Sequence, residues 1–492
     1  MPPYPPEAMR HLATPVGAGG LAAADAHGEA GAEACGDVVV IEIVVDGGCI
    51  TRAGFRARGC GATTAAASAA CEALTGASLD SALRISASSL DASLGGLGPE
   101  RRHGVEVAAD ATAAALEHWF GARLGAPGIP RRAGRVAVAM SGGVDSAVAA
   151  LLLAERGLDV VGVTMRLWHD PAVVRAERSC CAPETVRQAR DTCAAIGIPH
   201  LTIDAAERFR AEVVEDFIRG YAAGRTPNPC ITCNGEVRFR ILDEAAALLG
   251  AERLATGHYA RVVPGGSSPR LAAAEDASKD QSYMLARLDP GTLARLDLPL
   301  GDLHKDEVRH IARARGLPAA DAVESQDVCF VGAGGHAPFL ERAGGLAPHP
   351  GRIVDRDGAE MGQHDGYWRF TVGQRRGIGV AAPEPLYVLA TDAGRNEVVV
   401  GPRAALAQDR IHLEDVIAHD VPDHALEVRI RHHGRPLRGR LLIMGDATGT
   451  VVLEGAAEAV APGQTAALYD GGRLVAAGTI VRAGPGRHSM ED

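Results

Sequence analysis

Three cysteines stand in sequence contexts that suit sulfur or metal chemistry. Cys230 and Cys233 form a C-x-x-C pair in the segment TPNPCITCN, and Cys329 lies further along in ESQDVCF. Deprotonated thiols act as nucleophiles, as sulfur carriers and as ligands for metals. The three residues are therefore candidates for a metal site or for a reaction, and buried packing is the structural alternative.

A short glycine-rich segment, SGGVDS at residues 141–146, follows a predicted strand and opens a predicted helix. Its two glycines allow a tight turn that points backbone N–H groups inward, and the positive end of the helix dipole attracts an anion. Ser141 and Ser146 supply hydroxyl groups. The segment predicts a cradle for pyrophosphate, although it lacks the G-x-x-x-x-G-K-[ST] pattern of an ordinary P-loop. A purely structural turn is the alternative.

Length and composition indicate a globular protein of several domains. The 492 residues are 47% apolar and 23% charged, which suits roughly three domains. The ten cysteines are too sparse for a disulfide scaffold, and the sequence shows neither a long apolar run nor the features of a signal peptide. We therefore expect a cytoplasmic protein with reduced thiols and no membrane contact.

Charge is distributed unevenly. The net charge of −11 argues against indiscriminate nucleic-acid binding. Arginines nevertheless cluster late in the chain, and these clusters are either solvated strand faces or a surface that faces phosphate. Of the 50 basic residues only Lys279 and Lys305 are lysine. These two are candidates for sites that need a compact ammonium, with chance survival as the alternative.

The order of predicted elements divides the chain into segments. Residues 15–34 are expected to be a largely flexible lead-in to a hairpin over 37–59, which Ala-rich helices follow. After the linker GAPGIPRRAG, strands alternate with helices from residue 135, which predicts a doubly wound parallel sheet. Beyond about residue 345, strand–turn–strand units predict two small β domains.

Six motifs occur in an order that resembles the bacterial tRNA-specific 2-thiouridylases of the MnmA type: AMSGGVDSAVAA, TPNPCITCNGEVRF, ATGHYAR, SKDQSYML, ESQDVCFVG and FTVGQRRGIG. The resemblance covers residues 133–482 and implies ATP-dependent 2-thiolation of the wobble uridine of tRNA. It implies that ATP, with Mg²⁺, contacts Ala139, Met140, Ser141, Gly142, Gly143, Val144, Asp145, Ser146, Met165 and Gly257. It implies tRNA contacts at Asn228, Pro229, Cys230, His258, Lys279, Asp280, Gln281, Arg431, His432 and Gln464.

The implied chemistry assigns catalytic roles to Asp145, Cys233 and Cys329. Adenylation turns the C2 oxygen of uracil into part of AMP, a good leaving group, and a sulfur nucleophile then attacks C2. In one route Cys329 carries a persulfide and Cys233 closes a disulfide. In the other, Cys230, Cys233 and Cys329 hold a 4Fe–4S cluster that binds hydrosulfide. Cys230 stands where many members have aspartate, so the third thiol slightly favours the cluster; a zinc site would need a fourth ligand.

The segment ACGDVVVIEIVVDGGCITRAGFRARGCGATT resembles the IscU/NifU iron–sulfur scaffold, over residues 9–122. The resemblance implies that Cys35, Asp37, Cys60 and His103 bind zinc or a labile iron–sulfur cluster. The third cysteine expected after His103 is replaced by Gly104, and neither Cys49 nor Cys71 is placed to substitute. The sequence allows two roles for this domain: it delivers sulfur or cluster components, or it is a structural domain without scaffold activity.

The predicted fold class is α/β multidomain. An N-terminal α+β scaffold-like domain (1–128) precedes a doubly wound pyrophosphate-loop (PP-loop) ATPase domain (129–344), a central β domain (345–410), a C-terminal β-barrel that binds tRNA (411–482) and a tail (483–492). The predicted function is that of a tRNA-uridine 2-sulfurtransferase. A cysteine desulfurase or another donor is expected to supply its sulfur. A PP-loop ligase of small molecules and a non-enzymatic iron–sulfur or sulfur carrier compete with it, and tRNA-dependent turnover of ATP to AMP discriminates among the three.

Overall fold

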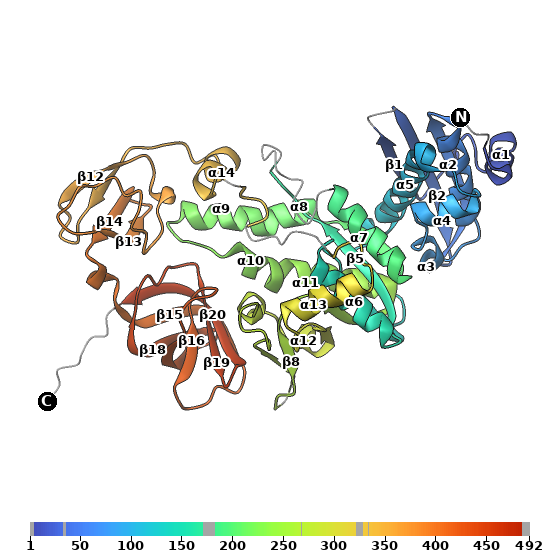
Figure 1. The fold of residues 1–492 in the computed structure, drawn as a ribbon. Coiled ribbons are helices and arrows are strands. Elements are labelled where there is room, and N and C mark those ends of the chain that lie inside the picture. Colours follow the sequence, from blue (N-terminus) through green and yellow to red (C-terminus); the bar gives the residue numbers. More distant parts are fainter. Residues whose placement is uncertain are drawn as a thin grey trace.

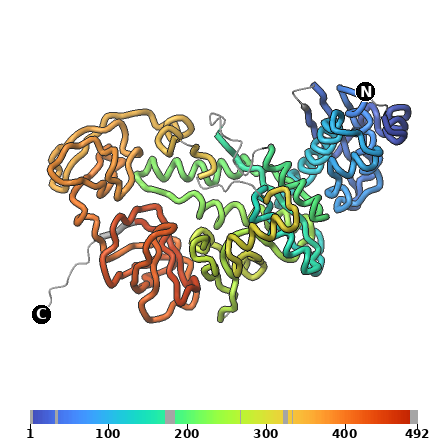
Figure 2. Tube along the Cα trace, viewed as in Figure 1, coloured from blue at the N-terminus to red at the C-terminus, as the bar shows by residue number. Residues whose placement is uncertain are grey.

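The computed structural model describes residues 4–32, 36–170, 183–266, 268–320, 328–332 and 334–484. Cys35, Cys180 and Cys181 lie outside these ranges. The N-terminal domain and the two β domains lie at opposite ends of the molecule, with the nucleotide domain between them (Figures 1 and 2). Within the described part of the chain, no helix combines the length and the apolar character that a membrane span requires.

The N-terminal domain packs helices against a three-stranded antiparallel sheet in the order β1-β2-β3. Val39, Ile41 and Ile43 alternate along β2 and are fully buried, as a half-solvated strand requires. The elements are α1 (Pro6–Ala13), β1 (Ala26–Ala32), β2 (Asp37–Asp46), β3 (Cys49–Arg58), α2 (Gly61–Leu74), α3 (Leu79–Ala82), α4 (Ala87–Ser93) and α5 (Arg102–Gly121).

The expectation of a flexible lead-in over residues 15–34 was wrong for strand β1, whose sequence AHGEAGA carries no strand pattern. Backbone pairing with β2, from Ala26 opposite Ile43 onward, holds β1 in place. Gly28 lies against α5, where an added Cβ would come within 2.1 Å of the Ala115 backbone nitrogen. The small residues therefore permit a close helix–strand approach that a propensity argument does not detect.

The nucleotide domain contains the predicted parallel sheet, in the order β10-β7-β4-β5-β6. The chain moves from β4 outward to β6 and then returns to the other side of β4, so the sheet has a topological switch point beside β4. Its strands are β4 (Arg132–Ala139), β5 (Asp159–Arg166), β6 (His200–Asp204), β7 (Ala251–Thr256) and β10 (Leu296–Asp297). Its helices are α6 (Val144–Glu155), α7 (Pro183–Ile196), α8 (Ala206–Phe209), α9 (Glu215–Ala222), α10 (Pro229–Thr232), α11 (Phe239–Leu249), α12 (Pro290–Arg295), α13 (Lys305–Ala314) and α14 (His336–Ala343).

Two β units follow, as the sequence predicts. The first is a four-stranded sheet in the order β12-β11-β14-β13, with strands β11 (Gly351–Val354), β12 (Glu360–His364), β13 (Tyr387–Asp392) and β14 (Glu397–Gly401). In the second, pairing of β15 with β20 closes a barrel. Its strands are β15 (Gln408–Ala418), β16 (Leu426–Arg429), β17 (Leu437–Gly445), β18 (Thr448–Ala457), β19 (Thr465–Asp470) and β20 (Arg473–Gly484), and β8 (Arg261–Val263) and β9 (Arg270–Ala272) extend its sheet from the nucleotide domain.

The N-terminal domain docks on the nucleotide domain through α5, which packs against the edge strand β6. The backbone N–H of His200 donates to the carbonyl of Leu83 at 3.0 Å, so the two backbones meet directly. Three acidic residues of the N-terminal domain pair with arginines across the contact: Asp80 with Arg132 and Arg135, Asp110 with Arg187 and Arg190, and Glu117 with Arg166. The domain is therefore held in a fixed position.

Candidate active site

The predicted pyrophosphate loop connects the central strand β4 to helix α6. The Ser146 hydroxyl accepts a hydrogen bond from the Ser141 backbone N–H at 3.1 Å and donates to the Gly143 carbonyl at 3.1 Å. Gly142 has a φ of +73°, and an added Cβ there would lie 2.5 Å from the Thr185 side chain. The loop thus requires glycine at position 142 and is held in shape by its own serine.

The neighbouring strands bring the other predicted nucleotide residues to the same edge of the sheet. Met165 lies near the end of β5, and Gly257 directly follows β7. An added Cβ at Gly257 would lie 2.7 Å from backbone atoms of Asp145 and Ser146, so any side chain there would push against the start of α6. Residues 139–146, Met165 and Gly257 therefore gather at the carboxyl edge of the sheet beside the switch point, where open parallel sheets bind ligands.

Asp145 lies in the first turn of α6 and is held by two residues, Lys305, which the sequence marked only as a candidate for a site that needs a compact ammonium, and Tyr259, to which the sequence assigned no role. The Lys305 ammonium lies 2.7 and 2.8 Å from the two carboxylate oxygens of Asp145, and the Tyr259 hydroxyl donates to one of them at 2.9 Å. Lys305 and Tyr259 are buried. The rarity of lysine was the only signal for Lys305, and Tyr259 carried none beyond its place in the motif ATGHYAR.

The C-x-x-C pair begins a short helix. Asn228 caps it by accepting a hydrogen bond from the Cys230 N–H at 3.2 Å, and Pro229 occupies the first helical position, as helix starts prefer. Cys233 is buried and opens a π-helical segment, Cys233–Arg238, a rare geometry that occurs often at functional sites. Burial and the neighbouring Cys233 raise the pKa of Cys230, and Arg238 opposes them. Cys230 is consequently a neutral thiol near pH 7 in this arrangement.

Cys329 is exposed between two anchored neighbours. Phe330 is 2% exposed and packs edge-on against Phe209 and Phe217, with ring centroids 5.8 and 5.4 Å apart. Val328 also packs against the core. The apolar residues Val328 and Phe330 therefore fix the backbone on both sides of Cys329, which is itself exposed.

The three thiols of the nucleotide domain are not gathered into a tight metal site. Among the described residues, Cys230, Cys233 and Cys329 do not form a group whose sulfur atoms all lie within 4.8 Å. A tetrahedral zinc ion with Zn–S bonds of about 2.3 Å needs sulfurs about 3.8 Å apart, so this arrangement does not support zinc. Cysteine thiolates are the ligands that hold a 4Fe–4S cluster, so the donor chemistry of the three residues fits that group.

Some predicted tRNA residues are engaged within the protein. Asp280 is 7% exposed, and its carboxylate accepts hydrogen bonds from the Ser282 hydroxyl at 3.0 Å and from Arg429 of the barrel at 2.6 Å. The Gln464 side-chain amide donates to the Thr226 carbonyl at 2.7 Å, just before the C-x-x-C helix. Asp280 and Gln464 therefore fasten the barrel to the nucleotide domain.

His258 and Gln281 lie beside the nucleotide loop. The Gln281 side-chain oxygen accepts a hydrogen bond from the Tyr259 N–H at 3.0 Å. Burial, followed by the charge of Arg238, lowers the pKa of His258 to about 3, and its Nδ1 lies 2.9 Å from the Thr256 hydroxyl. His258 is therefore neutral near pH 7 and cannot serve there as a cationic phosphate contact.

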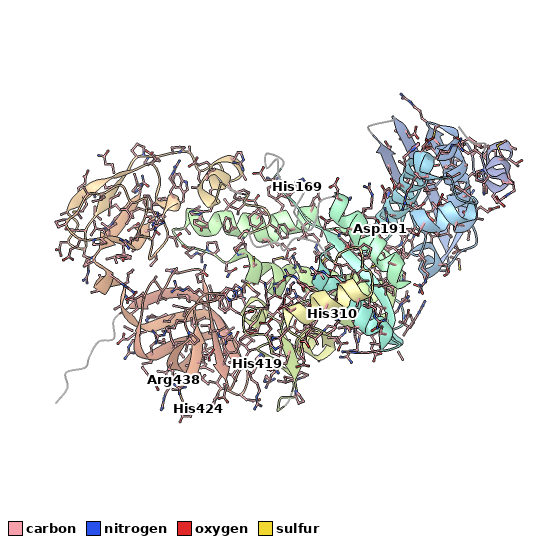
Figure 3. All side chains as sticks on the ribbon, viewed as in Figure 1. His169, Asp191, His310, His419, His424 and Arg438 are labelled. Atoms are coloured by element: carbon pink, nitrogen blue, oxygen red, sulfur yellow. The ribbon has the colours of Figure 1, made fainter. Side chains whose placement is uncertain are left out.

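The remaining predicted tRNA residues are more accessible. Lys279 is half-buried, Arg431 is exposed, and His432 stacks on Tyr283 with centroids 6.2 Å apart. Figure 3 shows Arg438 on the side of the barrel away from the central helices.

The N-terminal domain gathers three of its four predicted ligands. The Cys60 sulfur lies 3.3 Å from His103 Nε2, which lies 3.2 Å from a carboxylate oxygen of Asp37. Burial alone would raise the pKa of Asp37, but hydrogen bonds from Thr63 and Cys60 hold it below its ordinary value. The cysteine, histidine and carboxylate suit zinc or iron. The fourth predicted ligand, Cys35, lies outside the described residues.

Gly104 has a steric role. It lies where α5 crosses the start of α2, and an added Cβ would come 2.8 Å from backbone atoms of Ala62 and Thr63. A cysteine at this position would force the two helices apart. Cys71 is fully buried in α2, and burial raises its pKa to about 12. Neither Cys71 nor Cys49 belongs to the group around Cys60 within the described part of the chain.

The fold and site define a PP-loop type nucleotide domain followed by β units and preceded by a scaffold-like domain. Family models match in the same order: "NifU-like N terminal domain" over 3–124, "tRNA methyl transferase HUP domain" over 134–333, "tRNA methyl transferase PRC-barrel domain" over 338–402 and "Aminomethyltransferase beta-barrel domain" over 415–480. The chain is 43% identical to "Bifunctional protein NifU/MnmA" of Rubrobacter xylanophilus, over 97% of this chain and 99% of that protein. It belongs to the family of bifunctional NifU/MnmA proteins.

Relatives without the N-terminal domain match the rest of the chain. The "tRNA-specific 2-thiouridylase MnmA" of Azorhizobium caulinodans is 46% identical, over 72% of this chain and 94% of that protein. The protein of the same name from Chloroflexus aurantiacus is 45% identical, over 70% of this chain and 98% of that protein. Both resemblances described in the sequence analysis are thereby confirmed.

Proposed function

We propose that this chain uses ATP to replace the C2 oxygen of the wobble uridine of tRNA with sulfur. The observation that carries the proposal is that one domain holds both an anion loop at the switch point of its sheet and a capped C-x-x-C helix with an additional exposed cysteine. Several relatives bear the name tRNA-specific 2-thiouridylase. The proposal joins these two facts.

The first step activates the base. The uridine O2 attacks the α-phosphorus of ATP, so that an O2–P bond forms, the bond to the bridging oxygen breaks, pyrophosphate leaves and the N3 proton is lost. Loop residues 139–146 hold the leaving pyrophosphate, and Met165 and Gly257 adjoin the nucleotide, which arrives with Mg²⁺. The uridine must be splayed from the anticodon loop to reach this edge. Asn228, Pro229 and Cys230 face the base, and Lys279, Arg431 and His432 contact the RNA.

The second step transfers sulfur. The terminal sulfur of a Cys329 persulfide attacks C2, and AMP leaves with the original oxygen. The Cys233 thiolate then attacks the Cys329 sulfur, which closes a Cys233–Cys329 disulfide and leaves sulfur on the uridine. An external dithiol reduces the disulfide. In the alternative route Cys230, Cys233 and Cys329 would hold a 4Fe–4S cluster, and the cluster would supply a binding site for hydrosulfide. The exposure of Cys329 suits both routes.

We further propose that the N-terminal domain delivers sulfur or cluster components to the nucleotide domain. Cys60 is exposed beside His103 at the start of α5, and α5 also forms the docking contact, so the donor site is held at a fixed distance from the ATP domain. A cysteine desulfurase or another donor would load it. Full-length protein, a chain starting near residue 131 and the Cys60→Ser variant are compared at limiting donor. Equal rates of tRNA thiolation by the three proteins would refute the proposal that the N-terminal domain delivers sulfur or cluster components.

The proposed function is tested by supplying ATP together with a tRNA that carries uridine at the wobble position. We expect AMP and pyrophosphate to form only when this tRNA is present, and a matched tRNA with cytidine at that position to give neither. Turnover without tRNA would favour a ligase of small molecules. Binding of iron or sulfur with no turnover of ATP would favour a carrier.

A further inference from the structure

Helix α7 lies directly against the pyrophosphate loop. An added Cβ at Gly142 would lie 2.5 Å from the Thr185 side chain and 2.6 Å from the Thr185 carbonyl oxygen, so the first turn of α7 rests on the loop. Further along the helix, Cys193 is fully buried beside Gly162 of β5, where an added Cβ would lie 2.5 Å from its sulfur. Because the packing is this close, a movement of α7 changes the space that is available to the loop.

The N-terminal domain clamps α7 through one carboxylate. Asp110 of α5 accepts hydrogen bonds from Arg187 at 2.9 Å and from Arg190, and the two arginines lie three residues apart, on one face of α7. The Arg190 side chain is 12% exposed and that of Asp110 is 24% exposed, so water screens this pair only in part. Loss of the carboxylate would take this partner from a mostly buried guanidinium, which favours a shift of α7 that exposes the charge to water.

Helix α5 contacts a second element at the same edge of the sheet. Glu117 lies seven residues beyond Asp110, on the same face of α5, and pairs with Arg166 at 2.7 Å. Arg166 ends β5 directly after Met165. Asp80, in contrast, pairs with arginines at the amino end of β4. Two of the three docking carboxylates therefore act at the carboxyl edge, where the predicted nucleotide residues lie.

We propose that Asp110 is a positioning residue that holds α7 against the pyrophosphate loop, so that the docked N-terminal domain is a structural part of the nucleotide site. Ala108 and Ala111 beside it are fully buried in the N-terminal domain, which gives the carboxylate a firm base. The inference rests on the proposed use of ATP. It adds a role for the N-terminal domain that requires neither sulfur nor metal in that domain.

Calorimetry of ATP binding to the full chain tests the inference with three variants. Asp110→Ala places a strong helix former in α5 and is expected to weaken ATP binding about fivefold or more. Asp110→Glu keeps the negative charge and is expected to bind ATP within about twofold of wild type. Asp80→Ala is the matched control, because it removes a docking carboxylate at the other end of the sheet, and it should also stay within about twofold of wild type.

Hydrogen exchange supplies a second measurement. The amides of α7 should exchange faster in Asp110→Ala than in Asp80→Ala, because only the first variant releases the helix itself. Equal exchange of these amides in the two variants would contradict the clamp.

The outcomes of the binding experiment are separable. Unchanged ATP affinity in Asp110→Ala would overturn the inference. An equal loss in Asp110→Ala and Asp80→Ala would overturn it as well, since docking as a whole, and not the clamp on α7, would then support the loop. So would a loss in Asp110→Glu as large as that in Asp110→Ala. Failure of the wild-type chain to bind ATP would instead refute the proposed function, whereas wild-type binding that no variant alters refutes only the role of Asp110.

Discussion

The docking of the N-terminal domain depends on a buried arginine, and removing its partner is a sharp perturbation. Arg135 is 1% exposed at the start of β4, and its guanidinium lies 2.9 Å from Asp80 of the N-terminal domain. Within the nucleotide domain it also meets Asp159 at 3.2 Å and donates to the Leu249 carbonyl at 3.0 Å. The variant Asp80→Ala takes away this contact and the ion pair of Asp80 with Arg132, and it leaves the two contacts that Arg135 makes within the nucleotide domain.

The cost of this change follows from those contacts. Breaking a buried ion pair by removing one partner costs about 3–5 kcal/mol. Asp80 is 29% exposed, so water can enter, and Arg135 keeps two partners. We therefore expect the docked state to lose about 1–3 kcal/mol. Glu72→Ala is the matched control, because Glu72 pairs with Arg10 at 2.8 Å where both side chains are about half exposed, and such pairs contribute about 0–1 kcal/mol.

Hydrogen exchange measures the effect at the contact itself. The His200 amide donates to the Leu83 carbonyl across the domain boundary, so its protection reports docking. A loss of 1–3 kcal/mol corresponds to exchange that is about 5- to 150-fold faster in Asp80→Ala, with little change in Glu72→Ala. Equal protection of this amide in wild type and Asp80→Ala at neutral pH would refute the docking account.

The same pair predicts a pH dependence. Burial alone would raise the pKa of Asp80, but hydrogen bonds from Arg135 and Arg132 more than offset it and hold the pKa below its ordinary value. The stabilisation is thus fully present above the unfolded pKa of about 3.9 and is lost as the pH falls through the lower folded pKa. The difference in protection between wild type and Asp80→Ala should therefore disappear in that acidic range and persist at neutral pH.

Three further predictions concern the candidate active site. Cys329→Ser is expected to abolish sulfur transfer while tRNA-dependent AMP formation continues. The control Cys49→Ser removes another exposed thiol and should change neither activity. Loss of AMP formation in Cys329→Ser would contradict the role assigned to Cys329. Cys230→Ser separates the sulfur routes: joint loss of bound iron and thiolation supports the cluster, and full thiolation without iron supports the persulfide. Gly257→Ala is expected to lower ATP affinity at least tenfold because its Cβ would press on the Asp145 backbone, and unchanged affinity by calorimetry would show that the loop tolerates the displacement.

Local patterns predicted much of the fold. The apolar strand before SGGVDS, the glycines of that loop and the alternation of strands with helices are signals within a few residues of one another, and the parallel sheet with its loop is present as expected. Strand β1 escaped prediction because its pairing with β2 and the fit of Gly28 against α5 are tertiary features.

The arrangement of side chains was less accessible to sequence reasoning. Lys305 meets Asp145 only because α13 packs against α6, and no local pattern encodes a contact over 160 residues. Asp280 was predicted to contact tRNA from its motif, yet its carboxylate is buried on Arg429. A motif indicates that a residue belongs to a site, but only the packing shows whether its side chain faces the ligand or supports a neighbouring element.

The most direct test of the account is to quantify 2-thiouridine in tRNA by mass spectrometry together with the AMP released, using the full chain, ATP and a sulfur donor. The account predicts one 2-thiouridine at the wobble position for each AMP in wild type, and AMP without 2-thiouridine in Cys329→Ser. Thiolation that proceeds without ATP, or at an undiminished rate in Cys329→Ser, would contradict it.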